Sequence, residues 1–258
     1  MKILVCVKEV PEVNAPVRAD ISSGWLLLED SHYFRMNRFD EFAVEEAIRI
    51  KESLPDVTIA VLTVGQARAE KILRRAMGMG ADRAIHMLQE PGADTSPFTV
   101  ASAIAQHPGI GEYDLVLTGV MAEDDMQGQT GPMLAELLGI PCATAVVLVR
   151  VFLEERFVSV EREIERGMRD VLELSLPALL TVQSGINVPR YPSLSNMLRA
   201  NKAAPQVIEV SSLAMPEPRD VVVRGVVPGR SRKGLVLEGT TEKKATELAR
   251  ILVKRGLI

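Results

Sequence analysis

The sequence has little of what redox pairs and metal sites are built from. It holds two cysteines, Cys6 and Cys142, and each lies inside an apolar run far from the other. This spacing excludes a CxxC pair and a thiolate cage for zinc or an iron–sulfur cluster. The three histidines, His32, His86 and His107, fall at no ligand-like spacing. We therefore predict no metal site, and we expect both cysteines to be small core residues.

Long apolar runs and an excess of one charge are also missing. No apolar run reaches the roughly 18 residues that a membrane helix needs, and the first residues lack the features of a signal peptide. The formal net charge is only −4, which gives no general attraction to nucleic acid or anionic lipid. We expect no nucleic-acid binding and no membrane insertion. The sequence predicts a cytoplasmic protein, or a matrix protein if it is mitochondrial, with a protein partner or a small ligand.

What the sequence does have is an alternation of apolar runs and helical patterns. The runs are mostly apolar and do not alternate, as in strands that helices cover on both faces, and they lie at residues 3–7, 58–64, 83–87 and 115–118. Helical spacing extends between them from Asp40 or Glu41 to Leu54 and from Gln66 to Met79. This order predicts an α/β fold with a doubly wound, mostly parallel sheet.

The pattern changes after Pro141. Three β-rich segments with short connections predict an antiparallel extension, and a buried strand and a short helix follow; these elements lie at residues 143–149, 157–162, 171–174, 178–182 and 193–202. From residue 205 the chain loses its period until a last helix at 241–255. We therefore expect an α/β domain at 1–204 and a C-terminal arm at 205–258 that packs on a partner subunit.

A ligand of such a sheet binds beyond the carboxyl ends of the strands, where the strand order reverses. Three segments should meet there, namely residues 8–16, 37–40 and 119–132. The last lies between a strand and a helix predicted at 133–138, whose first turn offers unpaired N–H groups to an anion. Gly128 and Gly131 would let the backbone approach a phosphate, and Pro132 suits the first helical position.

The same segment has a plainer interpretation as a glycine-punctuated surface turn with a helix cap, and its spacing leaves both open. It matches neither the GxGxxG fingerprint nor the Walker pattern. Asp124 and Asp125 would repel a phosphate at contact, so we expect them to accept hydrogen bonds from hydroxyls, backbone or solvent. Asn37 is a capping candidate, with Asp40 as the far half of a capping box.

Six segments in order resemble the β subunit of electron-transfer flavoproteins. They read KILVCVKEVP at 2–11, MNRFDEFAVEEA at 36–47, MGADRAIH at 79–86, GVMAEDDMQGQTGP at 119–132, VEREIE leading to LPALLT at 160–181, and PRYPSL at 189–194. The resemblance covers the chain from its first residue to about Lys202.

The resemblance implies a heterodimer with an electron-transfer flavoprotein α subunit, in which this chain is an electron-carrier subunit with no catalytic side chain. It implies a structural AMP in the nucleotide-binding α/β domain of this chain. It also implies an FAD bound mainly by the α subunit, with residues 10–13 completing the flavin site. The positions that it implies for AMP are Cys6, Asn37, Arg38, Phe39, Asp40, Val64, Gly119, Val120, Met121, Ala122, Glu123, Asp124, Asp125, Met126, Gln127, Gly128, Gln129 and Thr130.

The resemblance further implies a docking segment for a transient dehydrogenase partner of the acyl-CoA type, from which electrons pass on to a downstream acceptor. Leu194 stands at the position of an apolar anchor that enters the partner. The implied docking residues are Arg190, Tyr191, Pro192, Ser193, Leu194, Ser195, Asn196, Met197, Leu198 and Arg199.

Two alternatives stay open. Some relatives hold a second FAD in place of AMP and split electron pairs, but they usually have DGDTAQ where this chain has DDMQGQ at 124–129, which favours AMP. An ATP-hydrolysing enzyme would need a lysine-bearing phosphate loop or acidic metal ligands, and only Asp124 and Asp125 come near that. The chain also departs from the family at Arg38, usually proline, at Arg166, usually small or acidic, and at Val13, aromatic in some members.

Overall fold

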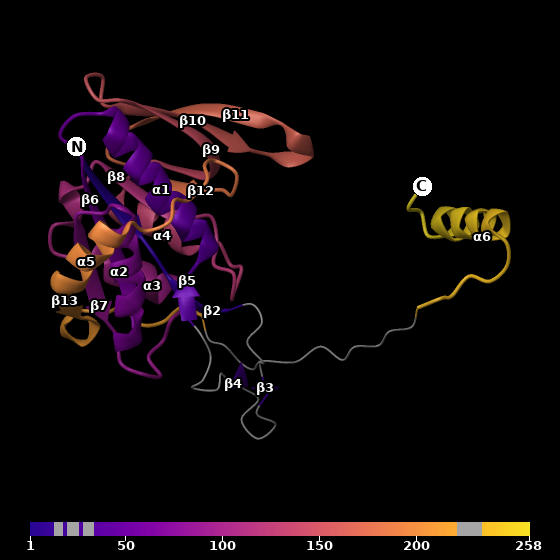
Figure 1. Ribbon diagram of the computed structural model, residues 1–258, viewed down its shortest axis with the longest axis horizontal. Helices are drawn as coiled ribbons and strands as arrows, with labels where there is room; N and C mark the ends of the chain where they lie inside the picture. Colours follow the sequence, from indigo (N-terminus) through magenta and orange to yellow (C-terminus); the bar gives the residue numbers. More distant parts are fainter. Residues whose placement is uncertain (13–17, 20–25, 28–33, 221–233) are drawn as a thin grey trace. The chain divides into compact units, whose positions relative to one another are not determined.

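The structure is a computed structural model that describes residues 1–12, 18–19, 26–27, 34–220 and 234–258. The chain divides into two compact units. The first comprises Met1–Arg18 and Leu27–Val223, and the second comprises Ala19–Leu26 and Arg224–Ile258. Figure 1 shows the first unit as strands flanked by helices.

The first unit is built on a nine-stranded sheet with the order β11-β10-β9-β12-β8-β1-β6-β7-β13. From β9 to β13 in this order all neighbours pair in parallel. These strands are β1 (Lys2–Cys6), β6 (Thr58–Gly65), β7 (Arg83–Leu88), β8 (Leu115–Gly119), β9 (Cys142–Phe152), β12 (Ala178–Val182) and β13 (Gln206–Glu209). The chain runs from β1 outward to β7 and then returns to β8 on the other side of β1, so the strand order reverses between β1 and β8.

Helices cover both faces of this sheet. Buried side chains of α1 (Arg38–Ser53), α2 (Glu70–Met79) and α5 (Leu194–Lys202) share one core layer with Ile3 and Val5 of β1. Side chains of α3 (Pro97–Ala105) and α4 (Thr130–Leu138) form the other layer with Leu4 and Cys6. Neighbouring residues of β1 thus enter opposite layers, which explains why the strand is apolar throughout. The predicted doubly wound α/β fold is confirmed.

The antiparallel extension consists of β10 (Phe157–Glu163) and β11 (Arg169–Ser175), which continue the sheet beyond β9. β9 changes register against β12 near Ala145, which has a φ of +56°, as expected of a bulge. The outer half of β9 is less buried than its first half. β10 and β11 pack on one face only, since Val158, Val160 and Leu174 join the layer of α1 and none of their side chains joins the layer of α3 and α4. The predicted antiparallel extension is thus present at this edge of the sheet (Figure 1).

Several short elements were not predicted from the sequence. β2 (Glu9–Pro11) pairs antiparallel with β5 (Phe34–Met36), and β13 adds an edge strand at the start of the predicted arm. Helix α3 was also missed. The remaining elements are the strands β3 (Arg18–Ala19) and β4 (Leu26–Leu27) and the 3₁₀ turns Ala67–Ala69, Ile110–Glu112, Glu165–Gly167 and Val210–Ser212.

The second unit contains helix α6 (Thr241–Lys254). The Thr240 side chain caps it by accepting a hydrogen bond from the N–H of Lys243, and Gly256 follows it with a φ of +65°. None of its residues is buried, and Leu248 and Val253 are exposed. The predicted division of the chain at residue 204 stays a prediction, and residues 221–233 lie outside the described part.

Candidate functional site

A cavity of about 350 Å³ lies at the carboxyl ends of β1, β6 and β8, beside the point where the strand order reverses. It belongs to the first unit. The three segments expected to meet there do meet, because residues from the loop after β1, from the start of α1 and from the β8–α4 connection all line it. The part of the first segment at residues 13–16 lies outside the described residues.

One wall of the cavity is apolar. It is formed by Cys6 of β1, Leu62 and Val64 of β6, and Val100 and Ile104 of α3. Burial raises the pKa of the Cys6 thiol to about 12, with the nearby charge of Asp40 as a smaller cause. The thiol therefore stays neutral, and this wall suits a flat, uncharged ligand group.

Asp40 fixes the ends of the two central strands. Its buried carboxylate accepts a hydrogen bond of 2.7 Å from the N–H of Lys8 and one of 3.0 Å from the N–H of Gly119. Burial raises the pKa of Asp40 to about 7, although these hydrogen bonds oppose the shift. A Cβ on Gly119 would lie 2.9 Å from the carbonyl carbon of Phe39, so α1 approaches β8 closely only because residue 119 is glycine.

Asn37 joins the start of α1 to the β8–α4 connection. Its amide nitrogen donates to the carbonyl of Met121 over 2.9 Å, and its amide oxygen accepts from the N–H of Glu123 over 3.1 Å. Asn37 makes no side-chain capping bond, so the predicted capping box with Asp40 was wrong. Both side chains turn instead to backbone groups of the neighbouring loops, which long-range packing brings within reach.

Lys8 closes one rim of the cavity. Its ammonium lies 2.8 Å from a carboxylate oxygen of Asp124 and 2.8 Å from one of Asp125. Burial lowers the pKa of Lys8, but the hydrogen bonds and charges of the two aspartates outweigh this and raise the pKa above its ordinary value. The aspartates also accept from backbone N–H groups, as predicted, whereas their ion pair with Lys8 was not foreseen.

The end of the β8–α4 connection and the first turn of α4 form a further part of the rim. Gln127, Gly128, Gln129, Thr130 and Gly131 all line the cavity. Gly128 has a φ of +63°, a conformation that favours glycine. Because N–H groups of a first helical turn have no partner inside the helix, this rim suits an anionic group.

One expectation for this turn needs correction. The helix begins at Thr130, so Pro132 occupies its third position and not its first. The approach of the Gly131 backbone to a phosphate stays a prediction, but a Cβ there would lie 2.7 Å from Cγ2 of Thr181 and 2.9 Å from Oγ1 of Thr118. Gly131 therefore lets α4 pack against the strands.

Most of the residues predicted for AMP line the cavity. The exceptions among them, all in the described part of the chain, are Arg38, Phe39, Glu123 and Met126. Glu123 accepts a hydrogen bond from the N–H of Arg38 over 3.2 Å and forms an ion pair with Arg35 over 2.7 Å. It therefore connects the cavity rim to the start of α1 without lining the cavity. Met126 is 65% exposed. The contact of each predicted residue with a nucleotide stays a prediction.

Sequence reasoning missed part of the cavity wall. Arg68 lies 4.0 Å from the ring centre of Phe34 and 2.7 Å from Glu9, which holds the β2–β5 ribbon against the end of β6. The N-terminus of α3 forms a further part through Pro97. A local signal for α3 exists, because Ser96 caps it by accepting from the N–H of Thr99 and proline follows at once.

The predicted docking segment at 190–199 lies away from the cavity, against α1 and α2. Tyr191 is 90% exposed, Leu194 78% and Leu198 57%. Ser193 caps α5 by accepting from the N–H of Asn196 over 3.2 Å. Val10 is buried, whereas Val13 of the predicted flavin-site loop lies outside the described residues.

Two further observations concern metal-binding clusters and membrane-spanning helices, neither of which was predicted. Within the described residues, no cluster of three or more histidine, cysteine, aspartate or glutamate side chains could hold a metal ion. No helix in the described ranges is both long and apolar enough to cross a membrane.

Fold and cavity together define a doubly wound α/β protein with a ligand-sized cavity at its switch point, a class that serves many functions. Comparison with known proteins narrows this class. The family model of the electron transfer flavoprotein domain matches residues 24–213. The chain is 34% identical over 229 residues to the electron transfer flavoprotein subunit beta of Bacillus subtilis, covering 87% of this chain and 88% of that protein.

Relatives from other kingdoms agree. The mouse electron transfer flavoprotein subunit beta is 34% identical over 254 residues, which cover 97% of this chain and 98% of that protein. The mitochondrial subunit beta of Oryza sativa subsp. japonica is 36% identical over 256 residues, which cover 94% and 95%. The chain belongs to the electron transfer flavoprotein β-subunit family, and the resemblance seen in the sequence is confirmed.

Proposed function

We propose that this chain is the β subunit of a heterodimeric electron transfer flavoprotein and that it holds a structural AMP in the cavity. The observation that carries the proposal is the arrangement of that cavity. An apolar wall around Cys6 and Val64 suits an adenine ring, and the first turn of α4 at the rim suits a single phosphate.

The size of the cavity favours AMP over a second FAD. Small-ligand sites range from about 300 to about 1,000 Å³, and about 350 Å³ lies at the lower end of that range. A dinucleotide with a flavin ring would need the rim to open. Such an opening would break the ion pairs of Lys8 with Asp124 and Asp125.

The polar groups of the cavity support a holding role. The carboxylate of Asp40 is engaged by backbone N–H groups, and the ammonium of Lys8 is engaged by two aspartates. Neither is placed as a free general base. A ligand held this way stabilises the folded chain by mass action.

Electron transfer itself would be the work of an FAD that the α subunit mainly binds. When bound, the flavin supplies the redox chemistry, and this chain contributes shape and a covering surface. The residues that the resemblance implies for the flavin site are 10–13. Val10 and Pro11 belong to β2, Glu12 follows it, and Val13 lies outside the described residues. The start of the predicted arm, β13, pairs with β7 of this chain; we further propose that the later part with the exposed helix α6 packs on the α subunit.

The exposed docking segment completes the proposal. The segment exposes three large, mainly apolar side chains, those of Tyr191, Leu194 and Leu198. Such exposed apolar groups are expected of a binding site for another protein. Its proposed partner is a dehydrogenase of the acyl-CoA type that meets the heterodimer transiently. Electrons would then pass to a downstream acceptor.

Co-expression with the α subunit tests the central claim. We expect a yellow heterodimer whose extract holds one AMP and one FAD. Val100→Trp, which fills the cavity, should abolish AMP retention, whereas Val171→Trp on the exposed face of β11 should leave it unchanged. Two FAD per heterodimer would favour the electron-splitting alternative, and release of phosphate from ATP would favour the enzyme. A heterodimer without any nucleotide besides its FAD would overturn the AMP assignment.

A further inference from the structure

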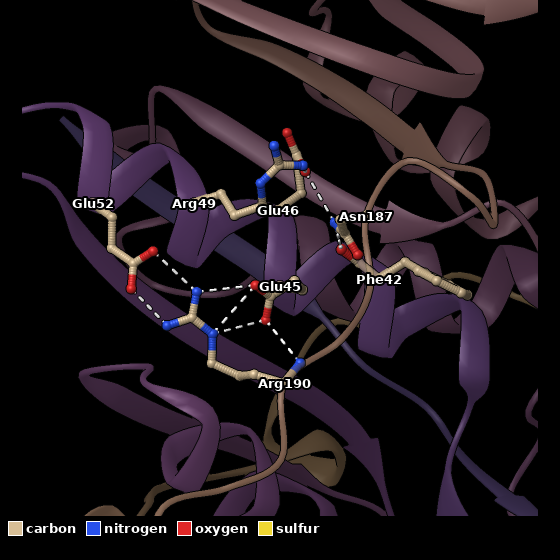
Figure 2. Close-up of polar contacts among 7 residues, drawn as sticks. All are labelled: Phe42, Glu45, Glu46, Arg49, Glu52, Asn187 and Arg190. Atoms are coloured by element: carbon tan, nitrogen blue, oxygen red, sulfur yellow. Dashed lines mark hydrogen bonds and ion pairs between the residues drawn. The ribbon is translucent and has the colours of Figure 1, made fainter.

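Helix α1 carries two buried carboxylates that the cavity does not use. Glu45 is 4% exposed and Glu46 is 5% exposed. Their partners Arg190 and Asn187 come from the segment after β12, about 140 residues further along the chain. Figure 2 shows the two glutamates as neighbours on α1. Because a buried carboxylate is costly unless it is paired, these contacts fix where that segment runs.

Arg190 joins two carboxylates of α1. Its guanidinium donates to Glu45 from Nε over 2.9 Å and from Nη2 over 3.0 Å, and to Glu52 from Nη1 over 2.6 Å. The backbone N–H of Arg190 also donates to Glu45 over 3.1 Å. The two carboxylates lie two turns apart on one side of α1, so the planar fork of arginine spans both (Figure 2).

Asn187, three residues earlier, makes a second set of hydrogen bonds to α1. Its amide nitrogen donates to Glu46 over 2.9 Å and to the carbonyl of Phe42 over 3.0 Å. Arg49 donates to the same carboxylate over 3.2 Å and to the carbonyl of Ile186 over 3.3 Å. Residues 186–190 are therefore attached along α1 by side chains and by backbone (Figure 2).

Helix α2 holds the other end of the segment. Arg74 donates to the carbonyls of Ala200 and Asn201 over 3.1 and 2.9 Å. Met197 and Pro192 pack onto Gly78 so closely that a Cβ there would collide with them. The segment is thus anchored on two helices that belong to the same core layer.

Between these anchors the apolar side chains point to solvent. Val188 is 87% exposed, and Tyr191, Leu194 and Leu198 follow it as exposed residues. We call these four residues the docking surface. The side chains that alternate with them, Arg190 and Met197, face the helices. The polar contacts of the segment, together with Met197, are thus made with the helices, whereas the four side chains of the docking surface face solvent.

We propose that Glu45 and Arg190 are positioning residues that hold the docking surface in its binding conformation before a partner arrives. The inference rests on the proposed function, in which this surface meets a dehydrogenase. A preordered surface binds more tightly because less conformational entropy is lost on association. Glu52 also accepts hydrogen bonds from the guanidinium of Arg190. Because its side chain is exposed and the ion pair is screened by solvent, it contributes less to holding the segment.

Hydrogen exchange in the FAD-loaded heterodimer tests the positioning directly, without any dehydrogenase. We expect faster exchange of the amides of residues 188–198 in Arg190→Gln, a smaller change in Glu52→Gln, and none in Arg156→Gln. Arg156 is the control, since it is an exposed arginine that pairs with one carboxylate, Asp114, and not with α1. Unchanged exchange at 188–198 in Arg190→Gln would overturn the inference. Glu52→Gln keeps the test decisive if Arg190→Gln does not fold.

Steady-state kinetics separates this inference from the proposed function. The electron donor is an acyl-CoA dehydrogenase reduced by its acyl-CoA, and the heterodimer is the varied acceptor. Arg190→Gln should raise KM about 5- to 10-fold, through ordering of several side chains on binding, and leave kcat unchanged. Arg190→Lys should recover part of the loss.

Leu194→Ala should raise KM without changing hydrogen exchange, because it removes the anchor and not its support. An unchanged KM for Leu194→Ala would remove the proposed docking role. The exchange result for Arg190→Gln would still decide whether Glu45 and Arg190 order the segment. A raised KM for Leu194→Ala with an unchanged KM for Arg190→Gln would overturn the positioning role alone.

Discussion

Helix α1 uses buried acidic side chains on two sides, and the two sides differ in what they hold. Toward the cavity, Asp40 binds backbone N–H groups at the ends of β1 and β8. Toward the docking surface, Glu45 binds mainly the side chain of Arg190. A side-chain substitution leaves in place the backbone N–H groups that bind Asp40. The single arginine side chain that binds Glu45 can be replaced. The cavity edge is therefore fixed by the fold, and the docking surface can change while the fold stays the same.

The substitution that we expect to destabilise the cavity side of α1 most is Gly119→Ala. Its Cβ would lie 2.9 Å from the carbonyl carbon of Phe39, and backbone cannot move aside cheaply. We expect the free energy of unfolding to fall by about 3 kcal/mol, at the upper end for overpacking. Urea unfolding measures this. Gly111→Ala is the control, because nothing lies within 4 Å of its added Cβ; an equal loss in both would refute the close-approach argument.

Asp40→Ala should have the next largest effect. It leaves the N–H groups of Lys8 and Gly119 without their acceptor, and an unsatisfied buried donor costs about 1–3 kcal/mol. We expect the unfolding free energy to fall by about 2–3 kcal/mol and the heterodimer to lose AMP. Asp124→Ala, an exposed partner of Lys8, should change stability by less than about 1 kcal/mol. If both variants were equally stable, Asp40 would not be the fixed point of this edge.

The same side chain predicts a pH dependence. Burial raises the pKa of Asp40 from 3.8 to about 7, so between these values the folded chain holds a proton that the unfolded chain releases. The contribution of Asp40 to stability is therefore greatest below about pH 4 and falls as pH rises through 7. Urea midpoints of the chain should decline between pH 5 and 8 more steeply than those of Asp40→Asn, which cannot titrate. Parallel profiles would contradict the raised pKa.

The smallest effect should come from Glu52→Gln on the docking side. Hydrogen bonds from Arg190 lower the pKa of Glu52, but its side chain is 58% exposed. Solvent screens such a pair, so we expect the free energy of unfolding to change by less than about 0.5 kcal/mol. Thermal unfolding of the heterodimer measures this. A loss as large as that of Asp40→Ala would erase the difference between the two sides of α1.

The architecture could be predicted because its signals are local. Mostly apolar runs such as residues 58–64 identified the buried parallel strands. Glycines such as Gly80, where α2 stops with a φ of +144°, mark helix ends. The family resemblance rested on the order of six segments, and that order survives any uncertainty in element boundaries. Helix α3 was missed although Ser96 and Pro97 carry a local start signal.

Residue types along the chain were enough to define the alternation of strands and helices, the edge of the sheet where a ligand would bind, and the family. They could not define the partners of polar side chains. Asn37 and Asp40 have the spacing of a capping box, yet they bind backbone groups about 80 residues away. Glu45 finds Arg190 across 145 residues. Buried polar groups take whichever partner folding brings within hydrogen-bond distance, and that distance is a property of packing in three dimensions.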